Sequence, residues 1–242
     1  MINWSPEGIA FRIDSENYCH IGADIARKIM PFISRESAVA DCGCGLGHVS
    51  LELCRCGINA TAIDVCAEPL EALKKLAFNE GIENLTVINS DYSALPEDLS
   101  FDHMIFCLSG DIDTILDVAE KHCTGRVIII RQRWKNHRFS LNESPIRESQ
   151  NENIPQKLSE LGIPYEILDF NQERGQPFRS PEDAVKFFRL YDTSGTEITS
   201  ETVLSRLVEN NDPEFPYFKP ASNAMSMIVL NVSDIHEPDG EA

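Results

Sequence analysis

The chain has 242 residues, which corresponds to one or two domains at roughly 150 residues per domain. Hydrophobic residues make up 42% of it and charged residues 25%, which allows a sizeable core and excludes a disordered, collagenous or low-complexity chain. The 21 basic and 39 acidic residues give a net charge of −18. A negative field of that size disfavours non-specific nucleic-acid binding, because such binding depends on neutralising phosphates with Lys and Arg.

Composition also sets expectations about the compartment. No apolar run is longer than five residues, whereas a membrane-spanning helix needs about 20. The first residues lack the basic and apolar regions of a secretory signal. The eight cysteines are sparser than in secreted disulfide scaffolds. We therefore expect a soluble, cytoplasmic protein with reduced thiols and no membrane association.

Short apolar runs alternate with helical stretches from residue 37 onward, which is typical of parallel βαβ units. Strands are expected at 38–40, 58–65, 85–89, 101–108, 125–130, 165–170 and 225–232. Helices are expected between them at 49–56, 68–79, 112–122 and 154–161. A single helix over 14–30 is expected before the sheet, since Ile21, Ile25 and Ile29 would share one face.

This pattern predicts three segments. Residues 1–36 would form an N-terminal helical lid, residues 37–232 the main domain, and residues 233–242 an acidic tail. A helical insertion at about 171–223, with helices at 181–191 and 200–210, falls between the last two strands and is large enough to cap a site. Aromatic residues occur in the lid and in the insertion, and the sequence leaves open whether they wall a pocket or pack a core.

The most informative motif is Asp41-Cys42-Gly43-Cys44-Gly45-Leu46-Gly47, between an expected strand and an expected helix. Glycines at such a position permit positive φ angles and a close approach of a ligand to the backbone. A dinucleotide motif G-x-G-x-x-G would need a third glycine where His48 stands, and a P-loop would need a lysine there. An NAD-dependent oxidoreductase and a nucleoside triphosphatase are therefore both disfavoured.

An acidic residue followed by G-x-G-x-G resembles the first motif of class I S-adenosylmethionine-dependent methyltransferases. Asp64 lies 17 positions after Gly47 at the expected end of the second strand. The stretch 90–92 (Ser-Asp-Tyr), with Leu-Pro at 95–96, follows the third strand, and Phe-Asp at 101–102 opens the fourth. These features are similar to the later motifs of that family, so the resemblance covers residues 37–132.

The resemblance implies an α/β, Rossmann-like, doubly wound sheet of seven strands in the order 3-2-1-4-5-7-6, with strand 7 antiparallel. It also implies that S-adenosylmethionine, and its product S-adenosylhomocysteine, would bind at the carboxyl edge of that sheet, where open α/β sheets place their ligands.

The same resemblance assigns roles to individual residues. Asp41 and Gly43 would face the methionine end of the cofactor, and Asp64 would accept hydrogen bonds from the ribose hydroxyls. Asp91 would accept from the adenine amino group, with Tyr92 beside the ring. Gly45 and Gly47 would let the loop pass under the ribose. The full set of expected cofactor-binding residues is Asp41, Cys42, Gly43, Gly45, Gly47, Asp64, Val65, Asp91, Tyr92 and Cys107.

One basic segment interrupts the acidic chain. Residues 121–138 contain six Lys or Arg and no Asp or Glu, against 15 basic and 39 acidic residues elsewhere. Arg131, Arg133 and Trp134 directly follow the fifth strand and suit an anionic substrate group. With Tyr18 and His20 from the lid, they are the candidate substrate residues. A solvated loop is the alternative.

Other chemistry has weaker support. The cysteine pairs are spaced C-x-C rather than the C-x₂₋₄-C of zinc sites, so no metal is expected. The stretch after Phe106 lacks the Asn/Asp-Pro-Pro-Tyr motif of enzymes that methylate adenine or glutamine nitrogens. Asp111 and Asp113 could hold a divalent ion, but a helix N-cap is the stronger interpretation of Asp111.

We therefore expect a methyltransferase that acts on a small anionic acceptor. If the acceptor is a hydroxyl or a thiol, Tyr18, His20, Asp111 and His137 are candidate bases, without a ranking among them. Two other functions stay open: methylation of RNA or protein with residues 121–138 as the docking segment, and cofactor binding without catalysis. The sequence does not decide between a monomer and a homodimer.

Overall fold

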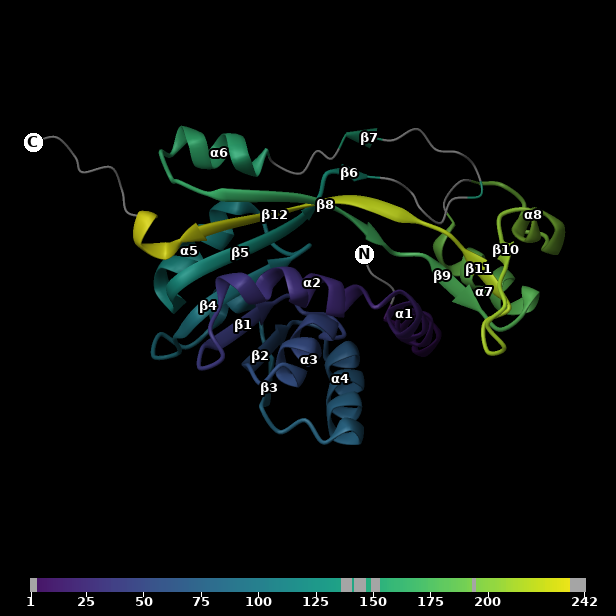
Figure 1. Ribbon diagram of the computed structural model, residues 1–242, viewed down its shortest axis with the longest axis horizontal. Helices are drawn as coiled ribbons and strands as arrows, with labels where there is room; N and C mark the ends of the chain where they lie inside the picture. Colours follow the sequence, from purple (N-terminus) through teal and green to yellow (C-terminus); the bar gives the residue numbers. More distant parts are fainter. Residues whose placement is uncertain (1–3, 136–140, 142–146, 149–152, 193–194, 236–242) are drawn as a thin grey trace, which may run out of the picture. The chain divides into compact units, whose positions relative to one another are not determined.

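The computed structural model describes residues 4–135, 141, 147–148, 153–192 and 195–235 (Figure 1). The chain divides into two compact units. The first unit consists of residues 1–21, 133–148 and 171–224, and the second of residues 22–132, 149–170 and 225–242. The predicted limits of lid, main domain and tail stay predictions.

A seven-stranded sheet dominates the second unit. Its strands are β1 (Ala38–Cys42), β2 (Asn59–Asp64), β3 (Leu85–Asn89), β4 (Phe101–Cys107), β5 (Cys123–Gln132), β8 (Glu166–Glu173) and β12 (Ser222–Asn231). They lie in the order β3-β2-β1-β4-β5-β12-β8. The first five run parallel, and β12 runs antiparallel to β5. The predicted order and the antiparallel last strand are confirmed.

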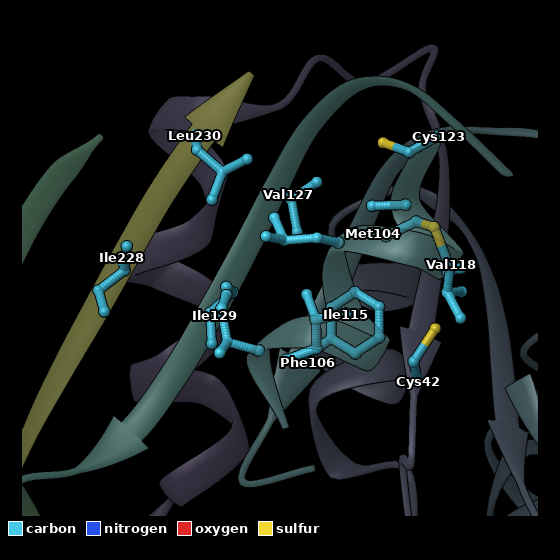
Figure 2. Packing of buried hydrophobic residues seen from close by; sticks show 14 of the residues in the cluster. Cys42, Met104, Phe106, Ile115, Val118, Cys123, Val127, Ile129, Ile228 and Leu230 are labelled. Atoms are coloured by element: carbon cyan, nitrogen blue, oxygen red, sulfur yellow. The ribbon is translucent and has the colours of Figure 1, made fainter. Parts of the chain in front are cut away.

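Helices pack against both faces of this sheet. They are α2 (Ile21–Ile29), α3 (His48–Arg55), α4 (Ala67–Glu80), α5 (Ile112–His122) and α6 (Ile154–Glu160). Because side chains alternate along a strand, Ala62 packs with α3 and α4 whereas Ile63 joins the cluster that contains α5 and α6. Figure 2 shows part of this second cluster, with Phe106 and Ile129 among side chains from β4, β5, β12 and α5. The burial of these apolar groups holds the sheet edge, and the loops on it, in place.

The single N-terminal helix predicted for 14–30 is wrong. Two helices, α1 (Pro6–Cys19) and α2, are separated by His20, whose φ of +52° cannot continue a right-handed helix. The hydroxyl of Ser5 accepts a hydrogen bond from the N–H of Gly8 at 3.1 Å, and Pro6 occupies the first helical position. The isoleucine periodicity belongs to α2 alone and therefore gave no information about where α1 begins.

The first unit is built on α1 and the segment after β8. It contains α7 (Pro181–Tyr191), α8 (Ser200–Leu204), a sheet of β9 (Gln176–Phe178), β11 (Tyr217–Lys219) and β10 (Val208–Glu209), and the pair β6 (Trp134–Lys135) and β7 (Arg147–Glu148). The α7 bounds match the prediction. The second predicted helix, 200–210, is wrong after Leu204, because residues 208–209 pair with β11 instead. The insertion is therefore not purely helical.

Two general features complete the description. Among the residues that the structure describes, no helix combines the length and hydropathy needed to cross a membrane. All eight cysteines are described, and no disulfide joins any two of them.

Candidate active site

The loops that carry the predicted motifs meet at one edge of the sheet. Strand β1 lies between β2 and β4 and is parallel to both, so the carboxyl ends of all three strands point the same way. The glycine loop, residues 43–47, follows β1, and Asp64 ends β2. The turn at 108–110 follows β4. In open α/β sheets this edge is where ligands bind.

The main-chain N–H groups of the glycine loop are used within the protein. Those of Gly43 and Cys44 donate to the carbonyl of Ile63 at 2.8 and 3.1 Å, and that of Gly45 donates to Oδ2 of Asp64 at 2.8 Å. The loop is thereby tied to the end of β2. These three N–H groups are therefore already hydrogen-bonded within the protein.

The space at Gly43 is enclosed by a residue that the sequence did not single out. The φ of Gly43 is +74°, and a Cβ atom there would lie 2.0 Å from Oγ of Ser109. The Ser109 side chain is also hydrogen-bonded to that of Tyr92, and burial raises the pKa of the Tyr92 phenol. Three segments of chain therefore meet around Ser109, a small polar loop residue whose importance no sequence pattern signals.

A substitution at Gly43 tests this contact. Gly43→Ala is expected to lower the free energy of unfolding by about 1 kcal/mol for the positive φ, and by more for displacing Ser109. Gly57→Ala is the matched control, because Gly57 has a φ of +87° and nothing within 4 Å of the added atom. Urea unfolding of both variants measures the difference. Equal losses would show that Ser109 does not confine Gly43.

Asp41 is the most strongly perturbed carboxylate described at this edge. It is 2% exposed, and its Oδ2 accepts a hydrogen bond of 2.6 Å from the hydroxyl of Ser50. Its Oδ1 is buried and has no hydrogen-bond partner. Burial raises the pKa of Asp41 to about 6, although the hydrogen bonds from Ser50 lower it, and nearby Asp64 adds to the rise. An orphaned buried oxygen of this kind suits a ligand that brings a donor or a positive charge.

Asp64 lies at the end of β2, where it was predicted, and is 8% exposed. Each carboxylate oxygen accepts one main-chain hydrogen bond of 2.8 Å, Oδ2 from Gly45 and Oδ1 from Cys66. A carboxylate oxygen can accept more than one hydrogen bond, so capacity remains for ribose hydroxyls. Asp64 thus joins the glycine loop to the start of α4.

Two of the expected cofactor residues, Cys42 and Gly47, make contacts that support the packing of the domain. The Cys42 side chain is fully buried in the core (Figure 2), and burial raises its pKa well above the usual range, so only its main chain can face a ligand at this edge. Gly47 caps α3 with a φ of +64°, and a Cβ atom there would lie 2.5 Å from the Leu73 side chain on α4. Gly47 permits this contact with α4.

The remaining three vary in exposure. Asp91 is exposed, and its Oδ1 accepts a hydrogen bond of 2.9 Å from the N–H of Ser93, which caps a short 3₁₀ helix at Tyr92–Ala94. Val65, just after β2, is 63% exposed, and Cys107, the last residue of β4, is half-buried. Their roles toward the cofactor stay predictions.

The prediction that Arg131 binds substrate needs correction. Its side chain is buried, and Nη1 donates to the carbonyls of Phe106 and Ile130 at 3.1 and 3.0 Å. Nη2 donates to the carbonyls of Ser109 and Gly110 at 2.5 and 2.8 Å. The guanidinium is therefore bonded to main-chain acceptors on β4, on β5 and, at Ser109 and Gly110, on the loop after β4.

The loop that Arg131 holds contains a strained residue. Leu108 has a φ of +58°, which a bulky L-residue adopts only at a cost of about 1 to 3 kcal/mol. Its N–H donates to the carbonyl of Ile130 at 2.9 Å. Strained backbone of this kind persists only where the surroundings impose it, and here the bonds of Arg131 to the carbonyls of Ser109 and Gly110 hold the loop.

The basic segment 121–138 does not form one patch among its described residues. Lys121 pairs with Asp117 at 2.8 Å, and Arg126 donates to the carbonyl of Phe32 at 2.9 Å. Strand β5 carries Arg126 and Arg131 about 17 Å apart, at 3.3 Å per residue. The segment is extended, so its charges separate to the two ends of a strand.

The other candidate substrate residues and bases have different local surroundings. Arg133 is exposed, and its N–H donates to the carbonyl of Ala224 at 2.8 Å. Trp134 is described only as main chain in β6, and His137 lies outside the described residues. In the first unit, the Tyr18 hydroxyl is hydrogen-bonded to the Asn210 side chain.

His20 and Asp111 are both helix-end residues. His20 is exposed at the end of α1. The N-cap interpretation of Asp111 is confirmed, because its Oδ1 accepts from the N–H of Thr114 at 2.9 Å. Asp113 forms an ion pair with Lys157 at 3.2 Å. Within the described part of the chain, no three His, Cys, Asp or Glu residues are grouped as a metal site would require.

Comparison with known families decides the identity. Residues 39–123, from β1 to the start of β5, match the family described as methyltransferase domain. The chain contains a class I methyltransferase domain. The family implies S-adenosylmethionine as the methyl donor, and enzymes of this family transfer methyl groups. No protein of curated function matches the sequence of this methyltransferase.

Solved structures share its fold. The YcgJ protein from Bacillus subtilis has a TM-score of 0.51 and 17% identity, over 86% of this chain and 97% of that one. A precorrin-6y C5,15-methyltransferase from Geobacter metallireducens has a TM-score of 0.53 and 12% identity, over 87% and 88%. A putative methyltransferase from Bacillus halodurans has a TM-score of 0.53 and 12% identity, over 87% and 98%. At these identities the likeness concerns the fold alone.

Proposed function

We propose that this methyltransferase binds S-adenosylmethionine at the carboxyl edge of β1, β2 and β4 and methylates a small anionic acceptor. The observation that carries the proposal is the buried Asp41 carboxylate, with one oxygen lacking a partner, beside a glycine loop in a methyltransferase fold. A buried carboxylate without a full set of hydrogen bonds is costly, so its retention fits a ligand that completes it.

The residues at this edge fit the cofactor. Asp41 would receive the ammonium group of its methionine end, which would lie along the main chain of Gly43. Asp64 has the acceptor capacity for the two ribose hydroxyls, and Tyr92 stands beside the adenine position. Their side chains come from β1, β2 and the turn after β3, three neighbouring strands of one sheet.

Methyl transfer from S-adenosylmethionine requires little from the protein beyond positioning the two reactants. When bound, S-adenosylmethionine supplies a methyl group on a positively charged sulfur: a lone pair of the acceptor forms the new bond, the sulfur keeps the electron pair of the broken bond, and the acceptor releases a proton if it carried one. The chain's own part is to hold the two reactants in line and exclude water. The Ser109 turn, fixed by Arg131, would form one wall of the position where they meet.

A small acceptor fits the charge distribution better than RNA. The net charge of −18 repels a polyanion, and the described cations of residues 121–138 are spread along β5 rather than gathered. The choice of a small acceptor over RNA depends on these two observations.

A transfer assay tests the acceptor. Purified protein and S-adenosylmethionine labelled in the methyl group would be offered a panel of small carboxylic acids and phosphate esters, their neutral amide and alcohol counterparts, bulk tRNA and a protein extract. We expect label on members of the anionic set only. Label on tRNA or on protein would contradict the proposal. Tight cofactor binding with no transfer to any member would indicate a binding protein without catalysis.

A substitution at Asp64 tests the proposed cofactor site most directly. Asp64→Ala is expected to weaken S-adenosylhomocysteine binding by about 1 to 3 kcal/mol, because two ribose hydroxyls lose a charged acceptor. Asp117→Ala removes the same charge from an exposed position on α5 and should leave the affinity unchanged. Calorimetric titration measures both variants. A folded Asp64→Ala variant with wild-type affinity would place the cofactor elsewhere.

A further inference from the structure

Arg12, on α1 in the first unit, is a half-buried cation without an acidic partner. Among the described residues no carboxylate lies within ion-pair distance of it, and its Nε is buried without a hydrogen-bond partner. Buried charges in proteins are normally paired and hydrogen-bonded. The lack of an acidic partner for Arg12 is notable because the chain has 39 acidic and only 21 basic residues.

Two aromatic rings accompany this guanidinium. Its central carbon lies 5.2 Å from the ring centroid of Trp4 and 5.9 Å from that of Tyr191. Tyr191 is in turn packed on Phe187, a buried residue of the same helix, with 4.7 Å between ring centroids. Aromatic faces stabilise the positive charge but accept none of the five N–H groups of an arginine in the way an oxygen does. The rings therefore position the guanidinium and leave its hydrogen-bonding capacity unused.

Arg179, in the same unit, is an arginine with a structural role and provides a comparison for Arg12. Its guanidinium also lies over an aromatic ring, 4.6 Å from the centroid of Phe215. Unlike Arg12, it forms ion pairs with Asp14 and with Glu214, the latter at 2.9 Å. These partners raise the pKa of Arg179. Stacking on an aromatic ring therefore does not prevent an arginine from forming ion pairs in this unit.

We propose that Arg12, flanked by Trp4 and Tyr191, forms a binding site for the oxyanion group, a carboxylate or a phosphate, of a small ligand. The guanidinium presents a planar fork that matches two oxygens of such a group. The site itself lies wholly within the first unit and can be tested without the cofactor.

Trp4 is a built-in reporter. The chain has two tryptophans, Trp4 and Trp134, so Trp134→Phe leaves the fluorescence of Trp4 alone. This variant would be titrated with sodium benzoate, with inorganic phosphate and with neutral benzamide at constant ionic strength. We expect a saturable change with benzoate or with phosphate and none with benzamide; whichever anion binds more tightly identifies the group. No saturable response to either anion, or an equal response to benzamide, would overturn the proposal.

Arginine variants localise the response. In the Trp134→Phe background, Arg12→Met should weaken anion binding at least tenfold. Arg189→Met, which removes the same charge from an exposed position on α7, should leave it unchanged. Equal weakening by both variants would mean that the anion responds only to overall charge, and an unchanged affinity in Arg12→Met would mean that it binds elsewhere. Either result contradicts the assignment.

Thermal unfolding separates a binding role from a structural one. Because Arg12 has no acidic partner to lose, Arg12→Met should melt at the wild-type temperature or above it, whereas Arg179→Met should melt below it. A fall in Arg12→Met equal to that in Arg179→Met would show a structural arginine and overturn the proposal. S-adenosylhomocysteine binding should be unchanged in Arg12→Met. A wild-type protein that binds benzoate and not S-adenosylhomocysteine would refute the proposed function and leave the anion site standing.

Discussion

Arg131→Met is expected to lower the free energy of unfolding by at least about 3 kcal/mol. The variant removes four hydrogen bonds from a charged donor, and each such bond contributes roughly 1.5 to 3 kcal/mol when its loss leaves an acceptor buried. The strained conformation of Leu108 also loses the hydrogen bonds by which Arg131 fixes its loop. The turn after β4 should then relax away from Gly43 and Tyr92, so we expect S-adenosylhomocysteine to bind about tenfold more weakly, a difference of about 1.4 kcal/mol.

The neighbouring arginine on β5 provides the control. Arg126 donates to a single carbonyl, that of Phe32, and lies over the same residue's ring. Arg126→Met should therefore cost only about 1 kcal/mol and leave ligand affinity unchanged. Urea unfolding and calorimetric titration of both variants make the comparison. Equal losses of stability, or an unchanged affinity in Arg131→Met, would show that Arg131 does not support the site.

Asp41→Asn is expected to remove a large part of the pH dependence of stability in the acid range. The native pKa of Asp41, about 6, lies above its ordinary value of 3.8, so the folded state holds a proton that the unfolded state releases. The resulting stabilisation is fully present below about pH 4 and is lost as the pH rises through 6. About two pKa units correspond to about 3 kcal/mol. The asparagine variant should therefore be more stable than the wild type at pH 7, by up to that amount.

The same substitution should have the opposite effect on ligand binding. A ligand ammonium group requires the ionised form of Asp41, so wild-type affinity for S-adenosylhomocysteine should rise between pH 5 and 7, while Asp41→Asn should bind weakly with little pH dependence. Urea unfolding and calorimetry at intervals across this range measure both effects, and Asp117→Asn serves as an exposed control. A variant with the wild-type slope would contradict the assignment of the raised pKa to Asp41.

Sequence patterns predicted the sheet well because their information is local. The apolar runs and the βαβ alternation depend on residues close together in the chain, and the strands that they indicated lie in the predicted order. The placement of Asp41 and Asp64 at strand ends followed from the same pattern, since the carboxyl ends of parallel strands share one edge. The family resemblance supplied the strand order itself.

The errors arose where distant residues decide. Arg131 was expected to bind substrate, but two of the carbonyls that its guanidinium contacts, Ser109 and Gly110, lie more than 20 positions away on the loop after β4. No local signal showed that a side chain at Gly47 would meet Leu73 on α4, and the predicted role of Gly47 at the ribose stays a prediction. The strand at 208–209 pairs with residues 217–218, a partner that helical periodicity cannot reveal. The isoleucine spacing likewise did not indicate that the main chain turns at His20.

The most direct test of the central claim is a calorimetric titration of the purified protein with S-adenosylhomocysteine, with NAD as the control ligand. The buried Asp41 and the Asp64 carboxylate beside the glycine loop predict saturable binding of S-adenosylhomocysteine, with a Kd of the order of micromolar, or about −8 kcal/mol, and no binding of NAD. Binding of NAD, or of neither ligand, would contradict the claim that this edge of the sheet holds S-adenosylmethionine.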